Sequence, residues 1–167
     1  MLNKKLATKL LSMSKADQDM RKLAEKDMSL FNNTLDKKHT SELKKIIEQH
    51  GWPTITMVGA QASNAAWLIV QHSDRNQEFQ EQCLELMQAL PENEVAQGDI
   101  AYLEDRVRVA QGRPQLYGTQ FDRPGKDFGP KEVEDKKNLD IRRKAVGLEP
   151  FETYRKSMVE FYQHIHL

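Results

Sequence analysis

The residues best suited to acid–base chemistry lie at the end of the most apolar stretch of the chain. Gln71, His72 and Asp74 follow directly after the apolar run Ala65 to Val70. A charged imidazolium is favoured at the C-terminal end of a helix, because the unpaired helix carbonyls point toward it. An imidazole in this position can give or take a proton during catalysis. We therefore take His72 as the candidate catalytic residue and Gln71 as a candidate substrate ligand.

The same segment also has a structural interpretation, which stays open. Asp74 and Gln77 have the spacing of a capping box that would begin the next helix. His72 could simply hydrogen-bond an unpaired carbonyl of its own helix. His72 and Asp74 could instead be two metal ligands, but the chain has no H-E-x-x-H motif and no cysteine cluster beside them. The sequence therefore predicts no metal site.

A second group of polar residues surrounds Gly118. Its members are Gln115, Tyr117, Thr119 and Gln120. Amide groups donate and accept hydrogen bonds at once, so they suit the orientation of a polar ligand, and a glycine lets the backbone approach that ligand closely. The alternative is a self-satisfied loop that docks onto the helices, with Tyr117 filling the core. These four residues are candidate substrate ligands, and both interpretations stay open.

Arg106 follows Asp105 on a predicted helix, so the two side chains diverge by about 100° and one of them faces the interior. A half-buried arginine can hold a phosphate or carboxylate through two hydrogen bonds, which makes Arg106 a candidate substrate ligand. Arg106 could equally form a structural ion pair with Asp17, Asp74 or Asp140.

Apolar residues recur at helical spacing along most of the chain, which predicts an all-α fold. The predicted helices cover about residues 2–30, as one long helix or two, and 40–50, 57–72, 74–90, 99–111, 136–146 and 150–165. A loop is predicted at 31–39, before a helix that Thr40 caps. Gly and Pro residues interrupt the pattern around 115–130, which predicts one irregular loop or short hairpin. We expect a bundle-like single helical domain over residues 1–167.

Composition excludes several classes of protein. The 25 Lys and Arg residues equal the 25 Asp and Glu residues in number, so the basic excess of a nucleic-acid-binding protein is missing. The longest apolar run is too short to span a bilayer, and Lys9 interrupts any signal peptide. Cys83 is the single cysteine, which favours a cytoplasmic setting, and it is expected to be a buried apolar residue. No nucleotide-binding glycine motif occurs, so no cofactor is expected.

Three motifs of the chain resemble those of a bacterial family of unknown function. They are A-A-W-L-I-V-Q-H-S-D at Ala65 to Asp74, A-Y-L-E-D-R-V at Ala101 to Val107, and G-R-P-Q-L-Y-G-T-Q at Gly112 to Gln120. A weaker match is D-Q-D-M-R at Asp17 to Arg21. Ser73 stands where the family is expected to have Ala. The resemblance implies a bacterial origin, but it implies no reaction and no cofactor.

Two classes of function fit these residues. One is a small cofactor-independent enzyme, a hydrolase or group transferase, in which His72 is the acid or base for a small polar or nucleotide-like substrate. The alternative is a non-catalytic domain that binds a ligand or a protein, its polar residues forming a buried structural network. The oligomeric state stays open. Unpaired buried polar groups cost a few kcal/mol each, so we expect His72 to meet the Gln115–Gln120 loop at one site.

Overall fold

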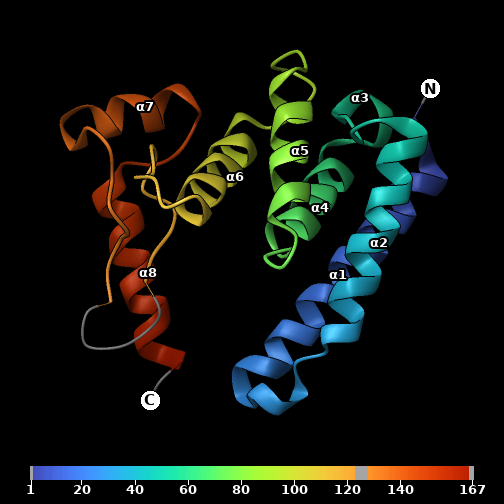
Figure 1. Ribbon diagram of the computed structural model, residues 1–167, viewed down its shortest axis with the longest axis horizontal. Helices are drawn as coiled ribbons and strands as arrows, with labels where there is room; N and C mark the ends of the chain where they lie inside the picture. The colour runs from blue at the N-terminus through green and yellow to red at the C-terminus, as the bar shows by residue number, and fades with distance from the viewer. Residues whose placement is uncertain (1, 123–127, 166–167) are drawn as a thin grey trace. The chain divides into compact units, whose positions relative to one another are not determined.

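The described residues of the computed structural model, 2–122 and 128–165, are mainly helical. They form eight α-helices and two short 3₁₀ helices, and they contain no β-strand (Figure 1). The predicted all-α fold class is therefore confirmed. Contacts within the chain group it into two compact units, Met1–Asp99 and Ile100–Leu167. Within the described part of the chain, none of the helices combines the length and the apolar character that crossing a membrane requires.

The first unit begins with a helical hairpin. Helix α1 (Lys4–Lys26) and helix α2 (Asn33–His50) lie side by side, joined by the 3₁₀ helix η1 (Met28–Leu30) (Figure 1). Asn3 caps α1 by accepting a hydrogen bond from the Leu6 amide. One face of α1 is buried, and it carries the polar residue Asp17 among its apolar side chains. This burial of a carboxylate requires partners from other elements.

Helix α2 begins earlier than the sequence predicts, and the predicted loop at 31–39 is wrong. The side chain of Asn32 accepts hydrogen bonds from the Thr34 and Leu35 amides, so it caps the helix in place of Thr40. Thr40 lies within α2 and donates its hydroxyl to the Asp36 carbonyl one turn earlier. The extra turns bring Asp36 onto the same helix as Thr40.

The predicted central helix at 57–72 is interrupted near its start. Helix α3 (Ile55–Val58) ends at Gly59, whose φ of 86° is favourable for glycine and strained for other residues. Helix α4 (Ala60–Gln71) then packs mainly on α1, and its alanines allow the two helices to approach closely. Helix α5 (Gln77–Gln88) begins after Asn76, so Asp74 does not cap it as the sequence predicts.

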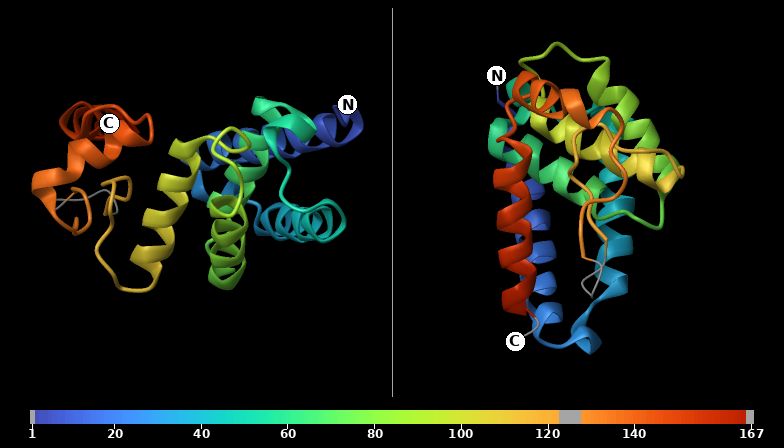
Figure 2. Two further views of the ribbon diagram at one scale, coloured as in Figure 1. Left: turned by 90° about the horizontal axis from the view of Figure 1, so that it is seen from above. Right: turned by 90° about the vertical axis from the view of Figure 1, so that its left-hand side faces the viewer.

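The second unit contains most of helix α6 (Gln97–Ala110), the 3₁₀ helix η2 (Lys136–Asn138), helix α7 (Leu139–Ala145) and helix α8 (Phe151–Ile165). Helix α7 lies across one end of α8 (Figure 2). Aromatic rings from three segments pack together, because Tyr154 of α8 makes edge contacts with both Tyr102 of α6 and Phe121.

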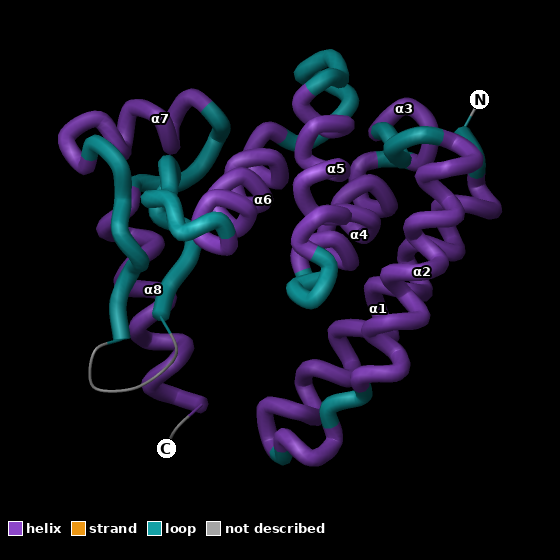
Figure 3. Tube along the Cα trace, viewed as in Figure 1, coloured by secondary structure: helices purple, strands orange, loops and turns teal. Residues whose placement is uncertain are grey.

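The connection from α6 to η2 is loop in its described parts (Figure 3). Two isolated β-bridges, Gln115 with Val133 and Phe121 with Pro130, hold its two sides together. The predicted irregular segment around 115–130 is thus confirmed in its described part, and residues 123–127 lie outside the described residues. The bridges place Gln115 at the base of a loop that is anchored on both sides.

Candidate functional site

His72 forms a hydrogen-bonded pair with a buried carboxylate of α1. It is the residue at which α4 ends, and its Nδ1 lies 2.7 Å from Oδ2 of Asp17. An ionised carboxylate can only accept hydrogen bonds, so the proton of a neutral imidazole resides on Nδ1. This is the only hydrogen bond that the ring makes to a described residue. Nε2 is therefore available as the proton acceptor.

Asp17 is held as an anion by three neighbouring side chains. Asp17 is buried, and its carboxylate accepts hydrogen bonds from Arg21 Nε at 3.1 and 3.2 Å and from Gln18 Nε2 at 3.0 Å. Burial by itself raises the pKa of Asp17, but the hydrogen bond and charge of His72, with the charge of Arg21, outweigh it and lower the pKa below its usual value. Asp17 is therefore ionised at neutral pH.

Arg21 connects this pair to α2. Its Nη2 donates to Oδ1 of Asp36 at 2.8 Å, so one guanidinium bridges two carboxylates from different helices. Burial raises the pKa of Asp36, and the charge of Arg21 only partly offsets that effect. Arg21 is thereby fixed in place, and it fixes Asp17 in turn.

The exposed side of His72 faces a small hollow of the first unit. This hollow has a volume of about 150 Å³. Its lining includes Arg21, Asp36, Lys37, Thr40, His72 and Arg75. The His72 side chain is 22% exposed, whereas that of Asp17 is 2% exposed. The imidazole therefore contacts the hollow while the carboxylate that orients it is shielded from solvent.

Ser73 also lines the hollow, and its hydroxyl contacts α2. Its Oγ lies 2.8 Å from the Ile69 carbonyl and 2.9 Å from Oγ1 of Thr40, and either hydroxyl can donate the hydrogen bond between the two side chains. Both hydroxyls are buried, so this contact ties α2 to the end of α4. An alanine, which the family resemblance leads one to expect at this position, could not make this contact.

Gln71 and Gln80 are buried where α4 ends and α5 begins. Gln71 is 4% exposed, as the last residue of α4. The amide of Gln80, which is 1% exposed, donates to the carbonyls of Val70 and Gln71 at 3.0 and 3.4 Å. Gln80 thus satisfies carbonyls at the end of α4 and helps to hold the backbone that carries His72.

In the second unit, Asp105 organises the predicted polar loop. This carboxylate is fully buried and accepts hydrogen bonds from the amides of Leu116, Tyr117 and Thr119 at 2.6 to 3.2 Å. It also accepts one from the Thr119 hydroxyl at 2.9 Å. Asp105 is therefore the member of the Asp105–Arg106 pair that faces the interior, while Arg106 is only partly buried.

The Gln115 side chain links backbone groups on the two sides of the loop. Its amide nitrogen donates to the carbonyls of Gln120 and Lys131, and its Oε1 accepts from the Gln120 amide at 2.8 Å. The Gln120 side chain in turn donates to the Thr119 hydroxyl at 3.0 Å. These contacts agree with the structural interpretation of the loop, because both functional groups of the Gln115 side chain are bonded to backbone.

Tyr117 is tied to the C-terminal helices through its carbonyl, which accepts a hydrogen bond from Nη1 of Arg143. Arg143 is 1% exposed, and its guanidinium lies 4.9 Å from the centre of the Tyr154 ring. Burial raises the pKa of the Tyr117 phenol, and the charges of Glu104 and Asp105 add to that effect. Tyr117 is therefore a neutral phenol at physiological pH.

His72 belongs to the first unit and the Gln115–Gln120 loop to the second. Within the first unit, the structure brings His72 together with Asp17, Arg21 and Asp36, which sequence reasoning did not place at the site. The available signal was the spacing of Asp17 and Arg21 by one helical turn, within the weaker D-Q-D-M-R match. That His72 meets the loop stays a prediction.

The described residues also bear on metal binding and on thiol chemistry. Within residues 2–122 and 128–165, no three His, Cys, Asp or Glu side chains are grouped so that they could hold a metal ion. Cys83 is buried as predicted, and burial raises the pKa of its thiol to about 12. A thiol with that pKa is protonated at neutral pH and is a poor nucleophile.

Comparison with known proteins gives one match. The model of a family of unknown function (DUF6624) matches residues 4–165. No curated protein matches the chain, and no solved structure matches it.

Proposed function

The chain belongs to this family of unknown function, and we propose from its own geometry that it is a small enzyme in which His72 is the general acid–base residue. The reaction is hydrolysis or group transfer on a small polar substrate, without a cofactor. Asp17 is the positioning residue, since it touches His72 and not the hollow. A cytoplasmic setting in a bacterium is part of the same proposal, and it rests on the family resemblance and the single cysteine.

The observation that carries this proposal is the 2.7 Å contact between a buried Asp17 and an imidazole that lines a hollow. In the proposed mechanism, Nε2 of His72 takes a proton from water or from a substrate hydroxyl as that oxygen attacks. Asp17 stabilises the resulting imidazolium, which then returns the proton to the leaving group. General acid–base catalysis of this kind typically contributes about 10² to 10⁴ in rate.

The cations around the hollow favour a substrate with an anionic group. Arg21 is already engaged by Asp17 and Asp36, so it serves mainly to hold the site together. Lys37 and Arg75 also line the hollow, and neither forms an ion pair with a described residue. These two side chains can approach a carboxylate or phosphate without breaking an existing ion pair.

The remaining predicted substrate ligands differ in burial and in hydrogen bonding. The buried side chains of Gln115 and Thr119 are bonded within their loop, which supports a structural role for them. Tyr117, Gln120 and Arg106 are partly exposed and stay candidate substrate ligands. Gln71 stays a candidate substrate ligand, mainly because it precedes His72 in the sequence.

The proposal is tested by comparing the wild-type protein with His72→Gln, which keeps a side chain of similar size. Both proteins are incubated with a panel of phosphate esters, carboxylate esters and amides, and product formation is followed by mass spectrometry. We expect at least one compound to be turned over by the wild type and its kcat to fall by about 10² to 10⁴ in the variant. Equal turnover by both proteins would exclude His72 as the acid–base residue.

A second measurement needs no substrate. Diethyl pyrocarbonate acylates neutral imidazole nitrogens, and we expect His72 to react at Nε2, because Nδ1 is engaged by Asp17. The modified nitrogen can be identified by mass spectrometry and NMR spectroscopy. An unreactive His72 in the folded protein would contradict an accessible proton acceptor. If instead the protein binds a compound from the panel without turnover, the non-catalytic binding domain is the better description.

A further inference from the structure

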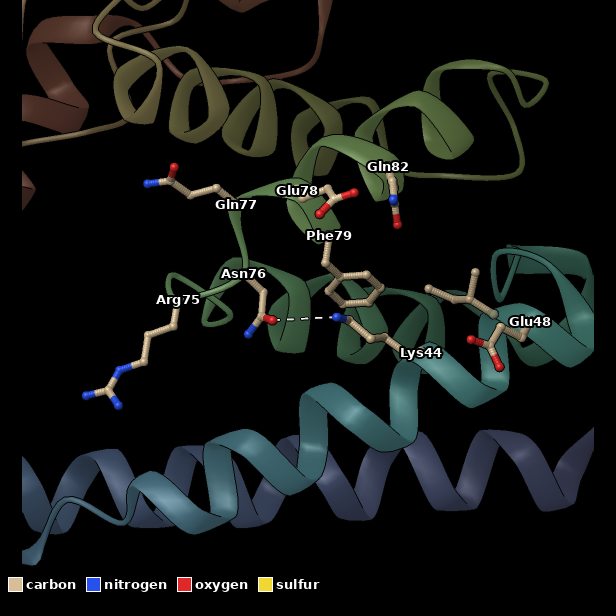
Figure 4. Close-up of a pocket in the computed structure, with 9 residues that line it drawn as sticks. Lys44, Glu48, Arg75, Asn76, Gln77, Glu78, Phe79 and Gln82 are labelled. Atoms are coloured by element: carbon tan, nitrogen blue, oxygen red, sulfur yellow. Dashed lines mark hydrogen bonds between the residues drawn. The ribbon is translucent and has the colours of Figure 1, made fainter.

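A larger hollow adjoins the one that His72 lines. It has a volume of about 480 Å³, and it lies between α2 and the first turns of α5 in the first unit (Figure 4). The two hollows share Arg75 and Asn76, which belong to the turn between α4 and α5. The hollow at His72, with about 150 Å³, is smaller than most ligand sites, which usually measure about 300 to 1,000 Å³. It has room for only a small part of a substrate. A substrate that reacts at His72 therefore needs this second hollow for the rest of its structure.

Lys44 lines the second hollow, and its ammonium has one long hydrogen bond and no carboxylate partner among the described residues. Its ammonium points at Asn76 beneath the Phe79 ring, 3.5 Å from Oδ1 of Asn76 and 5.0 Å from the ring centre (Figure 4). Phe79 is 5% exposed, so the ring removes water from one side of the ammonium. Lys44 forms no ion pair with any residue of the described part of the chain. A partly desolvated cation without a counterion favours the binding of an anion.

The acidic residues of the hollow restrict the charge of that anion. Glu48 and Glu78 also line it, so they balance Lys44 and Arg75 in formal charge. A ligand with several negative charges would be repelled by these carboxylates, whereas a single oxyanion can sit at Lys44. The amide of Gln82, which points into the hollow, can hydrogen-bond a neutral polar part of the ligand (Figure 4).

We infer that the second hollow binds one oxyanion, a carboxylate or a phosphate monoester, of the substrate that reacts at His72, with Lys44 as the residue that determines this specificity. The inference rests on the proposed function for the location of the reacting group. The substrate is thus a small polar acid that extends past Asn76 from one hollow to the other. Nucleoside triphosphates and other polyanions are disfavoured, because the two carboxylates repel their additional negative charges.

Binding of simple anions tests this inference without an assay of activity. Sodium acetate, inorganic phosphate and tripolyphosphate are titrated separately into ¹⁵N-labelled protein, and binding is followed by NMR chemical shifts. We expect acetate or phosphate to shift the resonances of Lys44, Asn76 and Phe79. Lys44→Gln should weaken this binding about tenfold, the size of a lost charge-assisted hydrogen bond, and tripolyphosphate should bind no more tightly than phosphate. A response to acetate alone assigns a carboxylate, and a response to phosphate alone assigns a phosphate monoester.

The matched control is Lys45→Gln, which removes an exposed lysine from the next position of α2 and should leave binding unchanged. The inference is overturned if neither anion shifts these resonances, if Lys44→Gln binds as the wild type does, or if tripolyphosphate binds more tightly. The outcome of these anion titrations does not depend on whether His72 is the acid–base residue. If His72→Gln keeps full turnover while Lys44→Gln loses anion binding, the proposed acid–base role fails and the anion site stands.

Discussion

Nδ1 of His72 and Oδ2 of Asp17 lie 2.7 Å apart, which joins the end of α4 to the middle of α1 across 55 positions of the sequence. The Asp17 carboxylate is buried in the core, whereas the His72 imidazole is partly exposed and lines the hollow. Arg21 and Asp36 extend this contact to α2. Loss of the Asp17–His72 contact should therefore lower the stability of the fold as well as affect the proposed acid–base chemistry.

Asp17→Asn is expected to destabilise the protein, because it leaves Arg21 and His72 facing an uncharged amide. We expect the free energy of unfolding to fall by about 3 kcal/mol, the usual cost of removing one partner from a buried ion pair. Urea denaturation followed by circular dichroism measures this change. Asp19→Asn is the matched control, since Asp19 is 55% exposed and pairs only with Lys15 among the described residues. A change below about 0.5 kcal/mol at both positions would contradict the structural role of Asp17.

Asp99 makes stability depend on pH in a direction that can be stated in advance. Burial raises the pKa of this carboxyl to about 6, although a hydrogen bond from Asn64 opposes the increase. A raised pKa favours the folded state while the group is protonated. The contribution of Asp99 is therefore fully present below its unfolded pKa of about 3.9 and is lost as the pH rises through about 6.

Urea denaturation of the wild type and of Asp99→Asn at several pH values checks this. We expect the free energy of unfolding of the wild type, relative to the variant, to decrease between about pH 4 and pH 6 and to be constant at higher pH. The asparagine does not titrate, so it removes this dependence while it can still accept a hydrogen bond from Asn64. A difference that does not change with pH would show that Asp99 has an ordinary pKa.

Asp105→Asn tests the structural role of the loop in the second unit. An amide cannot accept all the hydrogen bonds that Leu116, Tyr117 and Thr119 donate to the carboxylate. We expect a loss of about 3 kcal/mol in the free energy of unfolding and increased hydrogen exchange at these three amides. Asp122→Asn removes a half-exposed ion pair with Lys131 from the same loop and should cost less than about 1 kcal/mol. Unchanged exchange at the three amides would argue against Asp105 as the organiser of the loop.

The predicted meeting of His72 with the Gln115–Gln120 loop can be measured in solution. A nitroxide label is attached at Arg113→Cys, in a protein whose buried Cys83 is replaced by Ser. If the loop lies near His72, the label should broaden the NMR signals of His72 strongly. Unlabelled protein is the reference. Signals of His72 that keep their full intensity would separate the loop from the acid–base site.

Local patterns along the chain were sufficient to predict the all-α fold, the irregular loop and the burial of Cys83. These features depend on hydrophobic periodicity, on glycine and proline, and on neighbours within a few residues. Local capping was less predictable, because several side chains near a helix start can act as the cap. Asn32 rather than Thr40 begins α2 for this reason, and α5 begins after Asn76 rather than at Asp74.

The partners of the polar residues were decided by the tertiary structure. Periodicity indicates that Asp17 lies on a helix, but only the packing of α4 on α1 brings it within hydrogen-bonding distance of His72. In the same way, helical periodicity allows Asp105 to be assigned to a buried helix face. The loop amides that donate hydrogen bonds to its carboxylate lie 11 to 14 residues further along the chain. The physical reason is that a buried carboxylate must be compensated by donors in space, and the sequence order does not specify which donors the fold will deliver.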